Sequence, residues 1–210
     1  MIIAKSSSTN VQRELIPAGT HIARCYSMIH IGTVEWEYLG EQKNTDKVRL
    51  TFELPFEKKV FNEDNGEQPM VISKEYTLSL HEKANLRQDL ENWRGKSFTE
   101  AEVKAFDISK LIGVACSVSI VHKVAKNGNT YANIGAITST PKGTSCPDQV
   151  NESFEFNYDD KFNTEWLATA PEFLQEMITA TPEYKSCTEQ LNSVVETIKQ
   201  DLNLSNKMPF

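Results

Sequence analysis

The 210-residue chain contains no long apolar run. No stretch approaches the roughly 20 consecutive apolar residues that a membrane-spanning helix needs. Residues 1–11 carry Ser and Thr where a signal peptide has its apolar segment. We therefore expect a soluble cytoplasmic protein with no membrane partner.

Cysteine pairs and metal-binding patterns are also lacking. The four cysteines are far apart in the chain, without a C-x-x-C pair and without a histidine at zinc-ligand spacing. We expect reduced structural cysteines and no metal or other cofactor. The four are Cys25, Cys116, Cys146 and Cys187.

Motifs of the common enzyme classes are missing as well. No G-x-S-x-G, G-x-G-x-x-G or H-E-x-x-H is present. The G-K-S at residues 95–97 has Leu90 where a phosphate-binding loop has its first glycine. We predict no enzyme activity and no catalytic residue. A nuclease or enzyme accessory whose acidic residues converge only in three dimensions stays an open alternative.

Charge is unevenly distributed along the chain. Residues 1–143 hold 18 Lys and Arg against 17 Asp and Glu, a net of +1, whereas residues 144–210 hold 4 against 12, a net of −8. A near-neutral domain binds a polyanion when its cations share one face, because local potential decides binding. We therefore divide the chain into a domain of residues 1–143 and an acidic extension of residues 144–210.

Period-2 patterns predict the first strands. Residues 19–37 are rich in β-branched and aromatic side chains and include Gly32, which indicates a long, curled strand. Residues 47–54 alternate apolar and polar, which predicts a half-buried strand with a polar outer face. A third strand is expected over residues 70–80.

Helical spacing follows, and then strands again. Residues 82–93 have an apolar period typical of a helix that ends at Gly95, and Thr99 with Glu102 has the form of a capping box. Strands are predicted at 114–121 and 130–137, joined by an Asn-Gly turn. The predicted order of elements is three strands, a helix and two more strands, which is the connectivity of an OB fold. We therefore expect a mainly β protein with a five-stranded barrel and a helix between its third and fourth strands.

The extension has its own pattern. Turn-forming residues over 139–150 indicate a linker, and residues 165–177 and 188–202 have helical spacing. Two interpretations of the second apolar stripe stay open, packing within the chain and binding a partner. Its members are Leu191, Val194, Val195, Ile198 and Leu202.

Strands that carry cations beside aromatics suggest a ligand. Lysine and arginine neutralise phosphates, and aromatic rings stack on bases, which is how single-stranded nucleic acid is bound. A strand aromatic is also commonly part of a core, and a lysine part of a solvated face. The candidate residues are Trp36, Tyr38, Lys47, Arg49, Lys74, Tyr76, Lys123, Lys126 and Tyr131.

Three segments carry a resemblance. They resemble phage-encoded OB-fold proteins that bind single-stranded DNA or are associated with replication. The segments are N-W-R-G-K-S-F-T-E-A-E (92–102), F-D-I-S-K-L-I-G (106–113) and G-N-T-Y-A-N-I (128–134), with P-K-G ending at Gly143. The resemblance implies sequence-independent binding of single-stranded DNA in phage DNA replication, recombination or repair, by a groove across the sheet. It places the protein in the host cell cytoplasm.

The last residues are similar to a second family. The chain ends Met208-Pro209-Phe210 after an acidic region, much as bacterial single-stranded DNA-binding proteins end in Ile-Pro-Phe, but Asn206 and Lys207 stand where that family has aspartates. The similarity implies that the tail recruits replication or recombination proteins, or competes with DNA, in which case its removal tightens DNA binding. A Pro-Phe ending that arose by chance is the alternative for the tail. For the whole chain, two further possibilities stay open: that it forms a homo-oligomer, and that it is a replisome or recombinase interaction module that binds no DNA.

Overall fold

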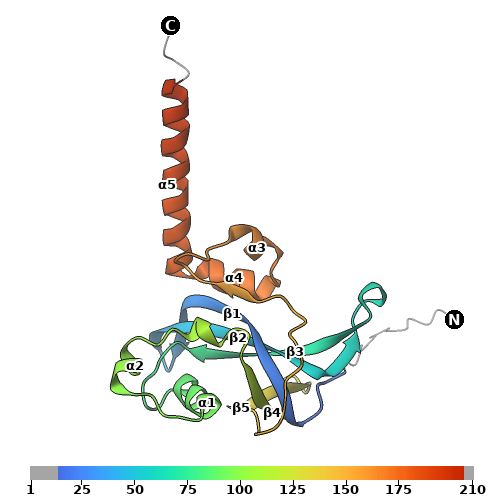
Figure 1. The fold of residues 1–210 in the computed structure, drawn as a ribbon. Helices are drawn as coiled ribbons and strands as arrows, with labels where there is room; N and C mark the ends of the chain where they lie inside the picture. The colour runs from blue at the N-terminus through green and yellow to red at the C-terminus, as the bar shows by residue number, and fades with distance from the viewer. Residues whose placement is uncertain (1–13, 206–210) are drawn as a thin grey trace, which may run out of the picture.

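The structure is a computed structural model that describes residues 14–205, the last six of them by their backbone. Six strands form one sheet, in which five long antiparallel strands have the order β3-β2-β1-β4-β5 and β6 runs parallel to β1 (Figure 1). A mainly β fold is thus confirmed. Within residues 14–205 no ladder joins β3 to β5. The strands are β1 (Gly19–Tyr38), β2 (Glu41–Val60), β3 (Glu67–Thr77), β4 (Ala115–Val124), β5 (Thr130–Thr138) and β6 (Phe154–Phe156).

Two helices lie between β3 and β4, as expected. Helix α1 (Asn85–Arg94) ends at Gly95, whose left-handed conformation (φ 67°) suits a residue without a Cβ. Helix α2 (Glu100–Lys104) begins with the predicted capping box. Short 3-10 turns occupy Glu63–Asn65 and Ile108–Leu111.

The alternation along β2 builds the main core. Its apolar residues face α1, where the rings of Phe52 and Trp93 lie 5.6 Å apart between centroids. The Trp93 indole N–H donates to the Ala115 carbonyl at 2.9 Å, so α1 is joined to β4 as well. The prediction that the alternating apolar residues of this strand are buried is confirmed. They are Val48, Leu50, Phe52 and Leu54.

The extension folds onto the opposite side of β1. The predicted helix of residues 165–177 is two helices, α3 (Thr164–Thr169) and α4 (Glu172–Ala180), because Pro171 has no amide N–H to continue the first. Helix α5 (Pro182–Ser205) follows. Strand β6 and these helices bury a second cluster of Ile29, Ile31, Phe156, Leu167, Ala170, Leu174 and Ile178.

The polar face of β2 is covered, which corrects the expectation of a half-buried strand with a wet outer face. Thr51 is 8% exposed and Glu53 is fully buried. The Glu53 carboxylate accepts hydrogen bonds from the backbone N–H groups of Val150 and Asn151 and from the Asn151 amide. The linker is therefore fastened to the sheet, while the domain boundary at Gly143 stays a prediction.

Among residues 14–205, none of the helices combines the length and the apolar character that crossing a bilayer would require.

Candidate nucleic-acid interface

The hairpin between β1 and β2 presents two of the predicted aromatics. Trp36 and Tyr38 are 45% and 52% exposed, and their ring centroids are 5.9 Å apart. The Trp36 indole N–H donates to the Thr45 hydroxyl at 2.8 Å, which fixes one edge of the ring. The Lys43 ammonium lies 5.0 Å from the centre of the Tyr38 ring and 3.9 Å from the exposed Glu41 carboxylate.

The tip of this hairpin is strained. Leu39 has φ 54° and Gly40 has φ 81°, both in the left-handed region, as a two-residue type I′ turn requires. Leu39 is the only described non-glycine residue with positive φ, and its side chain is 87% exposed. Backbone strain of this kind gathers at functional sites. Sequence reasoning missed Leu39 and Lys43, although Gly40 between two strand patterns is a usable turn signal.

The hairpin between β4 and β5 brings together three more predicted residues. Lys123 pairs with Tyr131 across the ladder, and Lys126 lies in the turn. Tyr131 is 46% exposed, and its hydroxyl accepts from the Asn127 amide at 3.2 Å. Both lysines are exposed, and neither forms an ion pair with an acidic residue in the described part of the chain.

Lys47 and Arg49 share one acidic partner. Both reach Glu75 on β3, at 3.9 Å and 2.9 Å between charged atoms. The Arg49 guanidinium also lies 5.2 Å from the centre of the Phe173 ring at the start of α4. The extension thus covers this part of the sheet.

Lys74 and Tyr76 face α1. Their side chains both bond the Asp89 carboxylate, at 2.7 Å and 2.8 Å. Tyr76 is 4% exposed, and burial together with the Asp89 charge raises the pKa of its phenol. Its ring is part of the core, so it offers no face to a base.

Three of the predicted residues meet at one hollow of about 660 Å³ beside β3. Lys47, Lys74 and Tyr76 line it with His81 and Lys83, which lie in the loop before α1. The nine candidates therefore occupy four places: this hollow, the covered Arg49 and the two hairpins. They do not form one continuous groove.

Two other features of residues 14–205 concern metal ligands and cysteines. No group of three or more His, Cys, Asp and Glu side chains could hold a metal ion there, and the four cysteines are free thiols. Burial raises the pKa of the Cys25 thiol to about 12, which keeps it protonated and unreactive.

No protein-family model matches the chain, and no curated protein is significantly similar to it.

Proposed function

We propose that this chain binds single-stranded DNA without sequence preference, in phage DNA replication, recombination or repair. One observation carries the proposal, namely that each of two hairpins combines exposed aromatic rings with nearby lysines. These are Trp36 and Tyr38 with Lys43, and Tyr131 with Lys123 and Lys126.

The strand order supports an OB fold. An OB barrel carries its helix between the third and fourth strands, and its oligonucleotide site involves the loops between strands 1 and 2 and between strands 4 and 5. The order β3-β2-β1-β4-β5 with α1 after β3 agrees with that connectivity, and the edge strands β3 and β5 approach each other. The two aromatic hairpins are the loops that the fold would use.

Because the extension and the linker cover part of the sheet, the proposed DNA contact lies mainly at the two hairpins. A groove across β2 would need Arg49 and its neighbours open to solvent, but Phe173 lies over Arg49 and the linker buries Glu53. The hairpin rings would stack on bases whatever their identity, and the lysines would neutralise phosphates. Affinity is therefore expected to fall with salt and to vary little with sequence.

The test is fluorescence anisotropy of a labelled poly-dT oligonucleotide at two salt concentrations. Replacing Trp36 and Tyr38 with alanine is expected to weaken binding at least about tenfold, because each stacked base is worth about 1–3 kcal/mol. Phe61→Ala is the matched control, since Phe61 is 61% exposed on the hairpin between β2 and β3. Failure of the wild type to bind at low salt, or an equal loss in the control, would reject the proposal.

Lysine variants test the neutralisation of phosphates in the same titration. Lys123→Ala with Lys126→Ala should reduce the slope of log affinity against log salt by about 0.7 for each phosphate that is no longer neutralised. Lys104→Ala with Lys142→Ala removes two exposed charges elsewhere and should leave the slope unchanged. A slope that responds equally to both pairs would assign binding to net charge rather than to the hairpin.

The proposed competition with DNA comes from the folded part of the extension. Residues 144–183 hold nine of the twelve acidic residues of 144–210, and β6, α3 and α4 in that segment pack against β1. Met208, Pro209 and Phe210, proposed to recruit a replication or recombination protein, lie outside the described residues.

Neutralising exposed acids on α4 tests this competition without unfolding the extension. Glu172→Gln with Glu176→Gln is expected to tighten poly-dT binding about two- to fivefold at low salt and to have no effect at high salt, because exposed charges are screened. Glu189→Gln with Glu196→Gln on α5 is the control. Equal tightening by both pairs would mean that only net charge matters.

A replisome interaction module that binds no DNA is the second candidate. It is favoured by α5, whose exposed apolar residues have no partner within residues 14–199. Absence of DNA binding with intact folding would support it.

A further inference from the structure

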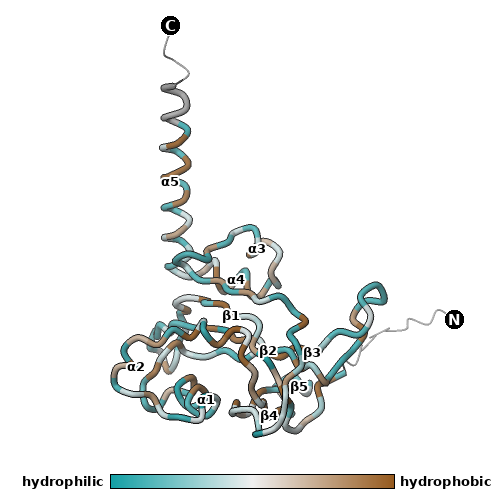
Figure 2. Tube along the Cα trace, in the orientation of Figure 1, coloured by the Kyte–Doolittle hydropathy of each residue, from teal (hydrophilic) through white to brown (hydrophobic). Residues whose placement is uncertain are grey.

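A polar hollow lies beside β3, the strand at one end of the sheet's order, where the chain turns towards α1. It has a volume of about 660 Å³ and is formed by β2, β3 and the loop that leads to α1. Most of α1 is hydrophilic (Figure 2), and among the residues that line the hollow only Ala84 has a wholly apolar side chain. An occupant of this hollow is therefore expected to be polar.

The position beside an edge strand brings together cations from both faces of the sheet. Lys74 points to the face that α1 covers, where its ammonium donates to the Asp89 carboxylate at 2.7 Å. Lys47 lies on the other face, because its neighbour Val48 points into the core and successive side chains of a strand alternate. Lys83 reaches the hollow from the loop before α1. Three lysines from three segments therefore line one hollow.

The hollow has an excess of positive charge. The Glu75 carboxylate is shared between Arg49 at 2.9 Å and Lys47 at 3.9 Å, so Arg49 retains this partner when Lys47 turns to a ligand. Lys83 forms no ion pair in the described part of the chain. Four cations thus meet two carboxylates, a net charge of +2. The cations are Lys47, Arg49, Lys74 and Lys83, and the carboxylates are those of Glu75 and Asp89.

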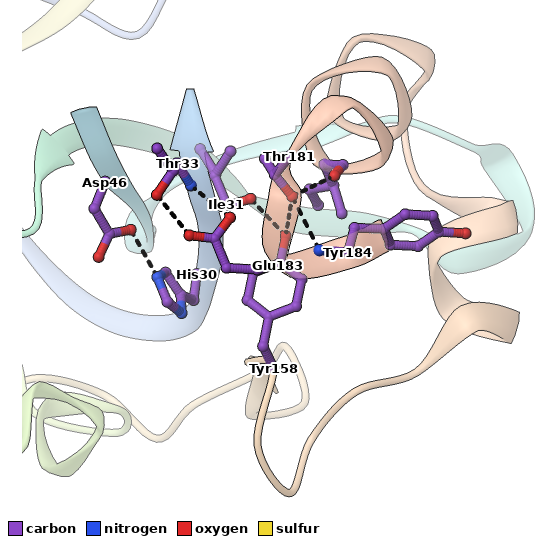
Figure 3. A network of polar contacts seen from close by, with 9 residues as sticks. His30, Ile31, Thr33, Asp46, Tyr158, Thr181, Glu183 and Tyr184 are labelled. Atoms are coloured by element: carbon purple, nitrogen blue, oxygen red, sulfur yellow. Dashed lines mark hydrogen bonds and ion pairs between the residues drawn. The ribbon is translucent and has the colours of Figure 1, made fainter. Parts of the chain in front are cut away.

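Two acids that are close in the sequence contribute no carboxylate to the hollow. Asp46 precedes Lys47, but its carboxylate pairs with the His30 ring at 2.7 Å, within the polar network of Figure 3. Its backbone carbonyl accepts from the Leu78 N–H at 2.8 Å, which fixes the start of the loop. Glu82 is exposed and does not line the hollow. The positive charge of the lysines therefore stays available to a ligand.

The start of α1 adds further donors. Ala84 is the N-cap and has no side-chain acceptor, and no acidic residue lies in the first turn. The first N–H groups of a helix have no partner within it, and the helix dipole favours an anion beside them. The His81 Nδ1 accepts from the Lys83 N–H at 3.3 Å, so the neutral ring carries its proton on Nε2 and is a donor there. These groups supplement the lysines.

We propose that this hollow binds a phosphate monoester, the group that a free nucleotide and the phosphorylated end of a strand both carry. Such a group has a charge of about −1.5 to −2 at neutral pH and three strongly accepting oxygens, which matches the excess charge and the ammonium donors. Lysine binds phosphate as a point charge, and its three N–H groups let Lys74 keep Asp89 while it contacts a ligand. A mononucleotide is sufficient as the ligand, so the proposal does not require DNA binding by the hairpins.

Equilibrium dialysis of the full chain against thymidine monophosphate tests the site, with thymidine as the control that lacks the phosphate. Saturable binding of the monophosphate alone is expected. Lys47→Gln with Lys83→Gln should weaken it at least about tenfold, because a hydrogen bond to a charged group contributes a factor of about ten or more. Lys104→Gln with Lys142→Gln removes the same charge from exposed positions outside the hollow. Equal weakening by this control pair would overturn the proposal.

A substitution that preserves the fold separates binding from folding. Ala84→Asp is expected to cap α1 and to keep or raise the urea midpoint, because residue 84 already has the extended backbone of an N-cap (φ −75°, ψ 132°). Its carboxylate should weaken phosphate binding at least about tenfold, because like charges a few ångströms apart repel strongly. Gln88→Glu adds the same charge one turn further along α1, outside the hollow, and should change the affinity less than about twofold. Undiminished binding by Ala84→Asp would contradict the proposal.

A dT oligonucleotide with and without a terminal phosphate separates the two sources of the group. Tighter binding of the phosphorylated strand, lost in Lys47→Gln with Lys83→Gln, supports a site for strand ends even where the mononucleotide does not bind. Trp36→Ala with Tyr38→Ala should leave thymidine monophosphate binding unchanged. Failure of the hairpins to bind DNA would reject the proposed function and leave this proposal standing. Absence of a phosphate effect with both the nucleotide and the strand would overturn it.

Discussion

Replacing Phe156 with alanine is expected to lower the free energy of unfolding by about 3–5 kcal/mol, the usual cost of emptying a buried aromatic site. Phe156 is 1% exposed and lies opposite Ile29 in the pairing of β6 with β1. Its ring packs against those of Tyr158, Phe162 and Trp166, with centroids 5.0–5.9 Å apart. Alanine would leave a cavity at the centre of the second cluster.

Urea unfolding with single-tryptophan probes measures this effect and tests the division at Gly143. Trp93 reports on the main core and Trp166 on the second cluster, once the other tryptophans are replaced by phenylalanine. We expect both probes to show the same loss. Phe173→Ala, at a half-exposed ring, should cost under about 1 kcal/mol. If only the Trp166 transition shifts, residues 144–184 unfold as a separate unit.

Glu53→Ala is expected to cost about 3 kcal/mol. The Glu53 carboxylate is fully buried and accepts four hydrogen bonds at 2.8–3.3 Å from the linker. Removing it leaves two backbone N–H groups and the Asn151 amide without their acceptor, and unsatisfied buried donors cost about 1–3 kcal/mol each unless water reaches them. Release of the linker should also loosen β6.

Equilibrium unfolding and amide hydrogen exchange at Val150 and Asn151 check this prediction. Glu57→Ala removes a partly exposed carboxylate that pairs with His21 at 3.0 Å and should cost less than about 1 kcal/mol. A loss of similar size in the two variants would show that solvent satisfies the linker's donors. In that case the linker is not fastened by Glu53.

Local signals predicted most of the elements. The period-2 alternation identified β2, and the Thr99 and Glu102 capping box identified the start of α2, because each depends on neighbours in the chain. Strand β6 was missed because three residues are too few for a period. The break at Pro171 was missed although proline at that position is itself a stop signal.

The candidate site was predicted less well. The Asn-Gly signal predicted the hairpin on which Lys123 and Tyr131 pair, because a short turn joins neighbouring antiparallel strands. It could not show that Tyr76 turns its ring to α1, since both faces of β3 carry polar residues. Which aromatic side chains are exposed and which are buried depends on how the helices pack on the sheet.

The sequence by itself determined which side chains of β2 share a face, where the capping box starts α2, and where acidic charge gathers. Only the tertiary structure decided which faces are wet. It covers Glu53 with residues about 100 positions away and leaves the stripe of α5 open. The reason is that periodicity arises from the local backbone geometry, whereas burial depends on segments that are distant in the sequence. No local pattern predicts which distant segment packs on a given face.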